Sequence, residues 1–225
     1  SSTPVADAPG PWLRVLVIAH ASGRDTGLGG LPVASGAITT ALAELDGVDV
    51  TLVTVGDTEP HGDATILTVA PDRPSPRAQL LDLGRAGDPG AVAGLPPRNS
   101  DAFDVVIGHS RYSSYAAMEI RNRWYPSAAL VDVVHTPIAR YAEIQKRKEG
   151  PELVRYETTV MYNADLVVGV GPLLTDVSRQ MAAESTRPPS FHELIPGIEV
   201  LGEVGPPPDG PDFNLLFVGR ATDKI

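Results

Sequence analysis

Apolar residues near the start of the chain follow two patterns, one typical of strands and one typical of a helix. Residues 13–18 (LRVLVI) and 48–55 (VDVTLVTV) are short, β-branched runs of the kind found in buried parallel strands. Between them, apolar side chains recur at steps of three and four residues, which predicts a helix that ends at Gly47. The apolar face of that helix comprises Ala34, Ala37, Ile38, Ala41, Leu42 and Leu45. These segments predict a right-handed βαβ unit.

The same alternation returns after residue 100. Apolar runs predict strands at 103–108, 128–134 and 165–170, and helical periodicity predicts helices at 113–123, 151–163 and 173–183. Strands that are apolar on both faces and alternate with helices indicate an α/β fold with a doubly wound parallel, Rossmann-like sheet. A proline-rich stretch at 70–100 interrupts the rhythm, with a short helical patch near 79–85.

Composition shifts suggest how the chain is divided. We expect residues 1–12 to be a tail and residues 13–201 to form an N-terminal domain. The segment 202–211 (GEVGPPPDGP) has the composition of a stiff linker. Residues 212–225 then contain FNLLFVG, which is typical of the first strand of another α/β domain. We therefore expect the chain to be a fragment, one domain plus the start of a second.

Charge and composition narrow the possible partners. The chain has 225 residues with 28 acidic and 18 basic side chains, a net charge of −10, which disfavours a nucleic-acid partner. It has no cysteine, so disulfides, thiolate metal sites and a cysteine nucleophile are excluded. No apolar run reaches the roughly 20 residues that a transmembrane helix needs, and the start lacks signal-peptide features. We expect a cytoplasmic protein without a transmembrane segment.

Candidate functional residues follow the predicted strands, because open parallel sheets bind ligands beyond the carboxyl ends of their strands. A glycine loop before the first helix would offer backbone amides to an anion. That loop is neither a G-x-G-x-x-G fingerprint nor a P-loop, since Pro32 takes the third glycine position and no lysine follows. The candidates are His20, Gly27, Gly29, Gly30, His109, Ser110, Arg111, His135, Thr136, Gly171 and Arg220.

Several short motifs together resemble one enzyme family. In chain order they are the glycine loop with its helix, DVVIGHS at 104–110, VHT at 134–136, Tyr156-Glu157 with NADLVVGV at 163–170, LIPGIE at 194–199, and LLFVGR at 215–220 with Lys224. This set resembles the retaining glycosyltransferases of the GT-B fold, family 4. The chain departs from the family pattern at Gly171, where serine is usual, and at 194–199, which lacks an asparagine.

The resemblance implies roles for particular residues. In such enzymes the acceptor binds the N-terminal domain, the nucleotide sugar binds the C-terminal domain, and transfer occurs between them. Donor-diphosphate binding would fall to Gly29, Gly30, Arg220 and Lys224. His135 would be the catalytic residue facing the donor sugar, and the acceptor side would comprise His109, Ser110 and Arg111. The resemblance implies no metal or other cofactor.

The sequence therefore predicts the acceptor-binding domain of a nucleotide-sugar-dependent retaining glycosyltransferase. The parent enzyme would transfer a hexose-type sugar to a small-molecule or glycan acceptor, and the main partner of this domain would be the C-terminal domain. The fragment alone is expected to be inactive. An alternative is a non-catalytic module on the same fold that senses a sugar or nucleotide. A flavodoxin-like receiver is disfavoured, because only Asp25 supplies an acidic residue after the first strand.

Overall fold

The computed structural model describes residues 13–19, 30–55, 58–69, 76–85, 94–136, 150–195 and 197. The described residues form one sheet of seven parallel strands in the order β3-β2-β1-β4-β5-β6-β7. This confirms the predicted doubly wound parallel sheet. The expected tail at 1–12, the linker at 202–211 and the strand within 212–225 lie outside the described residues.

The strands and helices alternate along most of the chain. The strands are β1 (Leu13–Ile18), β2 (Val48–Val55), β3 (Thr65–Val69), β4 (Val105–His109), β5 (Ala129–Val134), β6 (Leu166–Val170) and β7 (Ser190–Leu194). The described helices are α1 (Gly30–Ala43), α2 (Pro76–Arg85), α3 (Arg111–Trp124), α5 (Gly150–Asn163) and α6 (Pro172–Met181). None of these helices has the length and apolar composition that crossing a bilayer requires.

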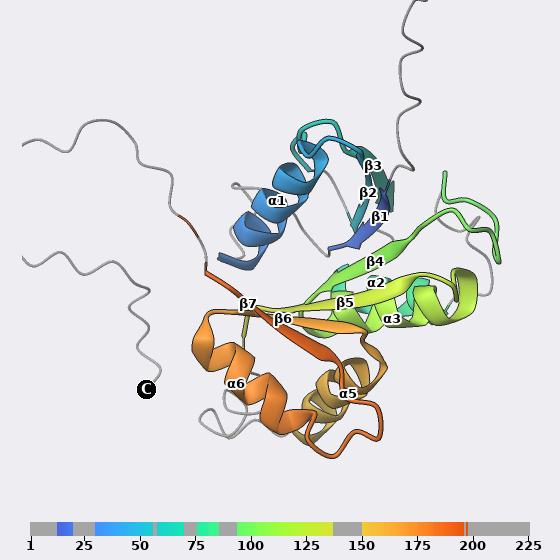
Figure 1. The fold of residues 1–225 in the computed structure, drawn as a ribbon. Coiled ribbons are helices and arrows are strands. Elements are labelled where there is room, and N and C mark those ends of the chain that lie inside the picture. Colours follow the sequence, from blue (N-terminus) through green and yellow to red (C-terminus); the bar gives the residue numbers. More distant parts are fainter. Residues whose placement is uncertain are drawn as a thin grey trace, which may run out of the picture.

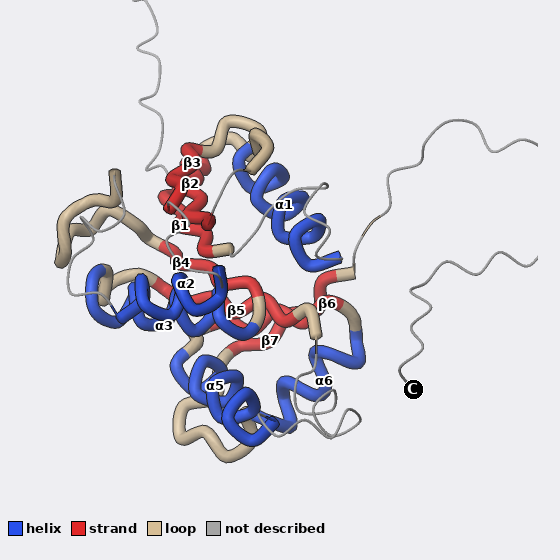
Figure 2. Tube along the Cα trace, turned by 180° about the vertical axis from the view of Figure 1, so that it is seen from behind, coloured by secondary structure: helices blue, strands red, loops and turns tan. Residues whose placement is uncertain are grey.

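The helices cover the two faces of the sheet unequally. Among the described helices, α1 lies on one face, while α2, α3, α5 and α6 lie on the other (Figures 1 and 2). Each face has its own apolar cluster. On the side of the four helices, Leu16 and Leu130 pack with Trp124, and on the side of α1, Val17 and Val133 pack with Ala43. Alternate side chains of one strand therefore enter different cores.

Two edge strands were not predicted from the sequence. β3 (TILTV) and β7 (SFHEL) lie at opposite ends of the sheet and bury little of their side-chain surface. Threonine, serine, histidine and glutamate alternate with apolar residues in them, so they lack the continuous apolar run of an inner strand. The predicted inner strands and helices are present; the strands at 13–18 and 48–55 match as predicted, and the other end points differ by at most four residues.

Only part of the apolar face predicted for α1 packs on the sheet: Ile38 and Leu42 contact the core on that side, whereas Ala37 and Ala41 are exposed. The buried positions are Pro32, Ser35, Gly36, Thr39 and Ala43. The Ser35 hydroxyl donates to the Pro32 carbonyl at 3.1 Å, and the Thr39 hydroxyl donates to the Ser35 carbonyl at 2.8 Å. Because these small side chains satisfy their polar atoms within the helix, they can be buried at little cost.

Two glycines allow helices to approach the sheet closely. A Cβ atom on Gly108 in β4 would stand 2.3 Å from the Cα of Ser114 in α3. A Cβ atom on Gly169 in β6 would stand 2.4 Å from the backbone nitrogen of Thr175 in α6. Since both contacts are with backbone atoms, only glycine fits without moving a helix. Both helices therefore begin directly against the carboxyl edge of the sheet.

At the opposite end of the strands, where they begin, two aspartates connect neighbouring strands. Each aspartate directly precedes a strand or stands at its start. Asp104 accepts the Arg14 backbone N–H at 2.8 Å and the Arg14 guanidinium NH2 at 2.9 Å. The hydrogen bond from Arg14 lowers the pKa of Asp104. Asp165 accepts the Leu130 backbone N–H at 2.9 Å and the Arg187 guanidinium at 3.1 Å.

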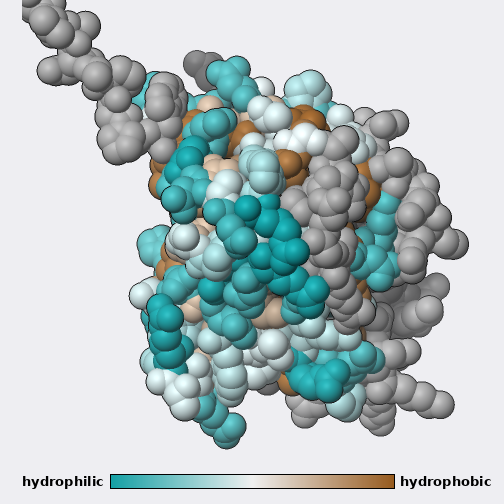
Figure 3. All heavy atoms as spheres, turned by 90° about the vertical axis from the view of Figure 1, so that its right-hand side faces the viewer, coloured by the Kyte–Doolittle hydropathy of each residue, from teal (hydrophilic) through white to brown (hydrophobic). Residues whose placement is uncertain are grey.

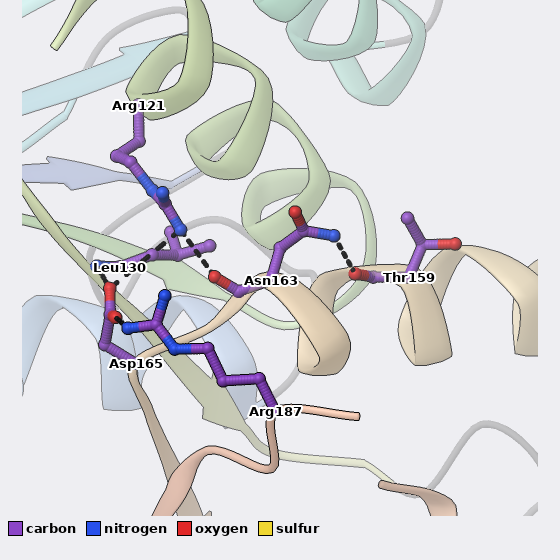
Figure 4. Close-up of polar contacts among 6 residues, drawn as sticks. All are labelled: Arg121, Leu130, Thr159, Asn163, Asp165 and Arg187. Atoms are coloured by element: carbon purple, nitrogen blue, oxygen red, sulfur yellow. Dashed lines mark hydrogen bonds and ion pairs between the residues drawn. The ribbon is translucent and has the colours of Figure 1, made fainter. Parts of the chain in front are cut away.

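Figure 4 shows the second of these anchors in full. Arg121 reaches from α3 to the Asn163 carbonyl at the end of α5 and lies 3.9 Å from Asp165, while Arg187 approaches the same carboxylate from the loop before β7. Each aspartate thus accepts a backbone N–H of a neighbouring strand and also binds an arginine side chain. The side of the molecule where the loop before β4 and the end of α3 lie is mostly hydrophilic (Figure 3).

Replacement of Gly108 by alanine is expected to destabilise the domain. The added methyl group meets the α3 backbone, so β4 and α3 must separate, at a cost of about 1–3 kcal/mol in the free energy of unfolding. Urea unfolding measures the change. Gly30→Ala is the control, since a Cβ there has no neighbour within 4 Å. Equal stability of the Gly108→Ala protein and the parent would show that α3 is not in this close contact.

Asp165→Ala is expected to lower the free energy of unfolding by about 1–3 kcal/mol, because it leaves the Leu130 N–H without its acceptor and removes the carboxylate that faces Arg121 and Arg187. The matched control is Asp176→Ala, which removes an exposed carboxylate 3.4 Å from Arg179 within one turn of α6. We expect the control to change stability by less than about 0.5 kcal/mol. Urea unfolding measures both variants. An equal loss of stability in Asp165→Ala and Asp176→Ala would contradict the stabilising role of Asp165.

Candidate functional site

A pocket of about 620 Å³ opens at the carboxyl edge of the sheet, between α1 and the ends of β5, β6 and β7. Two residues that the sequence placed at the site, Gly30 and His135, line this one pocket. They come from the start of α1 and the residue after β5, which are separated by more than 100 positions in the chain. The other described residues of the lining are Val33, Ala34, Ala37, Ile38, Ala41, Val170, Leu194, Ile195 and Gly197.

A pair of histidines stands at the ends of the two central strands. Nδ1 of His109, at the end of β4, lies 3.0 Å from Nε2 of His135, and the ring centroids are 5.3 Å apart. The register of β4 and β5 pairs His109 with Val133, so both rings project from the α1 face of the sheet. His109 is 1% exposed, whereas His135 is partly buried and borders the pocket.

The Ser110 hydroxyl ties the ends of β4 and β5 together. It accepts the His135 backbone N–H at 2.8 Å and donates to the Val133 carbonyl at 3.3 Å. Ser110 and Arg111 have backbone φ values of 53° and 45°, a region that residues other than glycine seldom adopt. Strained backbone of this kind clusters at functional sites, where surrounding contacts hold it. Here the contacts fix the backbone position of His135.

The surroundings of the two rings indicate which nitrogen carries the proton between them. Nε2 of His109 is buried and has no partner among the described residues. A buried N–H without an acceptor is rarer than a buried lone pair without a donor, so we place the His109 proton on Nδ1, where it donates to Nε2 of His135. His135 then carries its own proton on Nδ1. That N–H has no hydrogen-bond partner in the described part of the chain.

Burial keeps both rings neutral. Desolvation, with a smaller contribution from the neighbouring His135, lowers the pKa of His109 to about 3. Desolvation alone lowers the pKa of His135 to about 4. On the other face of β5, burial raises the pKa of Asp132 to about 6, while a 2.6 Å hydrogen bond from Ser114 opposes that shift. At neutral pH His135 is therefore a hydrogen-bond donor without positive charge.

The remaining predicted residues lie in different places. Arg111 lines a small niche with Tyr112, Tyr115, Leu153 and Tyr156, where the Tyr115 and Tyr156 rings pack edge to face at 4.8 Å. Neither Arg111 nor His109 lines the pocket between α1 and the ends of β5, β6 and β7. Gly29, His20, Arg220 and Lys224 lie outside the described residues, so their predicted roles stay predictions. Within the described ranges, no group of three or more histidine, aspartate or glutamate side chains could hold a metal ion.

Comparison with known proteins gives the family. A family model described as "GT4-conflict: Family 4 Glycosyltransferase in conflict systems" matches residues 16–225. The chain belongs to the family 4 glycosyltransferases in conflict systems. No curated protein sequence matches this glycosyltransferase chain.

One solved structure supports the fold. Sucrose-phosphate synthase from Thermosynechococcus elongatus matches 81% of this glycosyltransferase chain with 14% identity and a TM-score of 0.57. UGT2 from Phytolacca americana, solved with UDP-2fluoro-glucose and pterostilbene, matches 85% of the chain with 10% identity and a TM-score of 0.49. The chain spans about half the length of each, 47% of the synthase and 55% of UGT2.

Sequence reasoning selected some of the residues that gather at this candidate site. It located the two histidines and Gly30, because each follows a strand or begins the first helix. It missed the contribution of α1, whose residues Val33, Ala37 and Ala41 form a wall of the pocket. The helical periodicity of these residues was visible, but periodicity does not show whether an apolar face meets a sheet or a pocket.

The stability of this glycosyltransferase domain should depend on pH through the buried groups. Below pH 6.5 the unfolded chain protonates its histidines while His109 and His135 stay neutral in the fold, so stability falls toward pH 4. Each histidine contributes about 1.4 kcal/mol per pH unit. Asp132 acts in the opposite direction. Between about pH 4 and 6 its carboxyl group is protonated in the folded protein and ionised in the unfolded chain, so this group adds stability as the pH falls. Urea unfolding at pH 6.5, 5.5 and 4.5 measures the sum.

Two variants separate these contributions. His135→Asn should lessen the decline between pH 6 and 4 by about 1.4 kcal/mol per pH unit, because one histidine contribution is gone. Asp132→Asn should steepen the decline by about 1.4 kcal/mol per pH unit. If both variants keep the slope of the parent protein, these groups are not buried as neutral species.

Proposed function

We propose that this chain is the acceptor-binding half of a glycosyltransferase that moves a hexose-type sugar from a nucleotide sugar to an acceptor hydroxyl. The observation that carries the proposal is the meeting of Gly30 and His135 in one pocket at the carboxyl edge, in a chain of a glycosyltransferase family. Open parallel sheets place their ligands at this edge. The donor half of the enzyme would be supplied by a C-terminal domain that begins within residues 212–225.

The proposed reaction exchanges one bond at the anomeric carbon. The acceptor oxygen forms a bond to that carbon while the bond from the carbon to the diphosphate oxygen breaks, and its electron pair leaves with the nucleoside diphosphate. The acceptor hydroxyl gives its proton to the departing phosphate oxygen, on the same face, so the configuration is retained. Charge develops on the diphosphate as the bond breaks, and groups that stabilise this charge accelerate transfer.

The chain's own residues would divide this work. The Nδ1–H of His135 would donate to a hydroxyl of the donor sugar and hold the ring against the acceptor. The amides of Gly29 and Gly30, at the start of α1, would face the diphosphate. Arg220 and Lys224 would supply positive charge to its oxygens, Arg220 as a fork and Lys224 as a point charge. These cations would make a metal ion unnecessary.

A panel of uridine, guanosine, adenosine and thymidine diphosphate sugars, offered to the full-length protein in EDTA, tests the proposal. We expect one or a few donors to be consumed, with release of the nucleoside diphosphate and an acceptor product of retained configuration by NMR. Tight binding of a nucleotide sugar without any turnover would contradict the transferase and favour a sensing module. Activity that requires an added divalent ion would contradict the metal-free mechanism alone.

His135→Ala in the full-length protein is expected to lower kcat/KM by about a hundredfold, the usual effect of losing one hydrogen bond to a transition state. His135→Asn should retain more activity than His135→Gln, because the asparagine amide reproduces the position of Nδ1 and the glutamine amide that of Nε2. The control is His192→Ala, an exposed histidine on β7. Full activity of His135→Ala would remove this residue from the mechanism.

A further inference from the structure

The described walls of the pocket are almost entirely apolar. α1 contributes alanine, valine and isoleucine side chains, and the facing wall consists of Val170, Leu194 and Ile195 at the ends of β6 and β7. Ile195 is 75% exposed and Val33 is 43% exposed, so these walls are open to a ligand. The volume of about 620 Å³ falls in the range of small-molecule sites, roughly 300–1,000 Å³.

The orientation of α1 accounts for this lining. The helix buries its hydroxyl-bearing and smallest residues, Ser35, Gly36 and Thr39, and lines the pocket with apolar residues such as Val33, Ala37 and Ala41. Apolar side chains that face water forgo the free energy of burial. A ligand with an apolar surface recovers that free energy when it covers α1.

Among the described lining residues, polar recognition is confined to one end of the pocket. His135 is the only side chain with a polar atom among the described lining residues, and none of those residues carries a charge. A sugar phosphate would need cations, and an oligosaccharide would need partners for many hydroxyls, since each unpaired buried hydroxyl costs binding free energy. The described lining offers neither. The acceptor's one reacting hydroxyl needs no partner from these walls, because in the proposed reaction it donates to the departing phosphate oxygen.

We propose that the acceptor is a small apolar alcohol or phenol, whose apolar body lies between α1 and the ends of β6 and β7 with its reacting hydroxyl beside His135. The inference rests on the proposed function and names the substrate class of that same site. The hydroxyl is the group that forms the new bond to the anomeric carbon. The class excludes sugar phosphates and oligosaccharides as acceptors.

Calorimetry with the full-length protein tests the binding step without any need for turnover. The probes are 2-naphthol and 1-octanol, with glucose 6-phosphate and maltose as polar comparisons. We expect the apolar probes to bind with a negative change in heat capacity, the mark of apolar burial, and the polar compounds to bind at least tenfold more weakly. Transfer to the same four compounds is then measured with the nucleotide sugar that the protein consumes.

Variants of the two walls locate the binding site. Ala37→Phe places a ring in the pocket from an exposed position of α1, and Ile195→Asn puts an amide in the facing wall. Each should weaken 2-naphthol binding at least tenfold. Ala183→Phe, at an exposed position just after α6, is the matched control and should change it less than twofold. Circular dichroism verifies that all three variants are folded.

The outcomes separate the inference from the proposed function. If glucose 6-phosphate or maltose accepts sugar and the apolar probes neither bind nor react, the transferase stands and the apolar acceptor is overturned. If 2-naphthol binds and both wall variants weaken it, but no donor gives transfer to any acceptor, the apolar site stands and the transferase fails. Binding of 2-naphthol that neither Ala37→Phe nor Ile195→Asn changes overturns the inference, because the probe then occupies another place.

Discussion

The hydroxyl of Ser110 is the contact on which the geometry of the site depends. It joins the Val133 carbonyl to the His135 backbone N–H, so the last residues of β4 and β5 are held at a fixed separation. That separation in turn sets the 3.0 Å contact between the two rings. The price is a turn with positive φ at Ser110 and Arg111. The close packing of α3 against Gly108 leaves the chain little room for a more relaxed turn.

The two edges of the sheet have different tasks. At the edge where strands begin, Asp104 and Asp165 each combine a backbone acceptor with an arginine partner, which links strands that are distant in sequence. At the edge where strands end, the polar groups are neutral and incompletely paired, as in Nε2 of His109. Incompletely paired polar groups cost stability, and the anchors at the far edge can offset that cost. Both aspartates belong to motifs that resemble the family, but their contacts show a structural contribution.

Much of the fold could be predicted because inner parallel strands are apolar on both faces, as LRVLVI and VDVTLVTV illustrate. β3 and β7 could not, since an edge strand buries too little to require an apolar run. For the site, the rule that ligands bind after parallel strands selected His109, His135 and Gly30 without knowledge of their distances. The tie through Ser110 and the tautomer of His135 depend on positions within an ångström, and sequence spacing contains no such information.

The orientation of α1 shows why periodicity alone misplaced its buried face. Two faces of this helix could pack on the sheet, one apolar and one made of Ser35, Gly36 and Thr39. The second face brings the helix axis closer, because its side chains are small, and its hydroxyls return to the helix's own carbonyls. Val33, Ala37 and Ala41 are then left to line the pocket, where the proposed apolar acceptor would cover them. A helix with hydroxyls on its buried side and apolar residues on its open side is poorly optimised for stability and well suited to holding an apolar ligand.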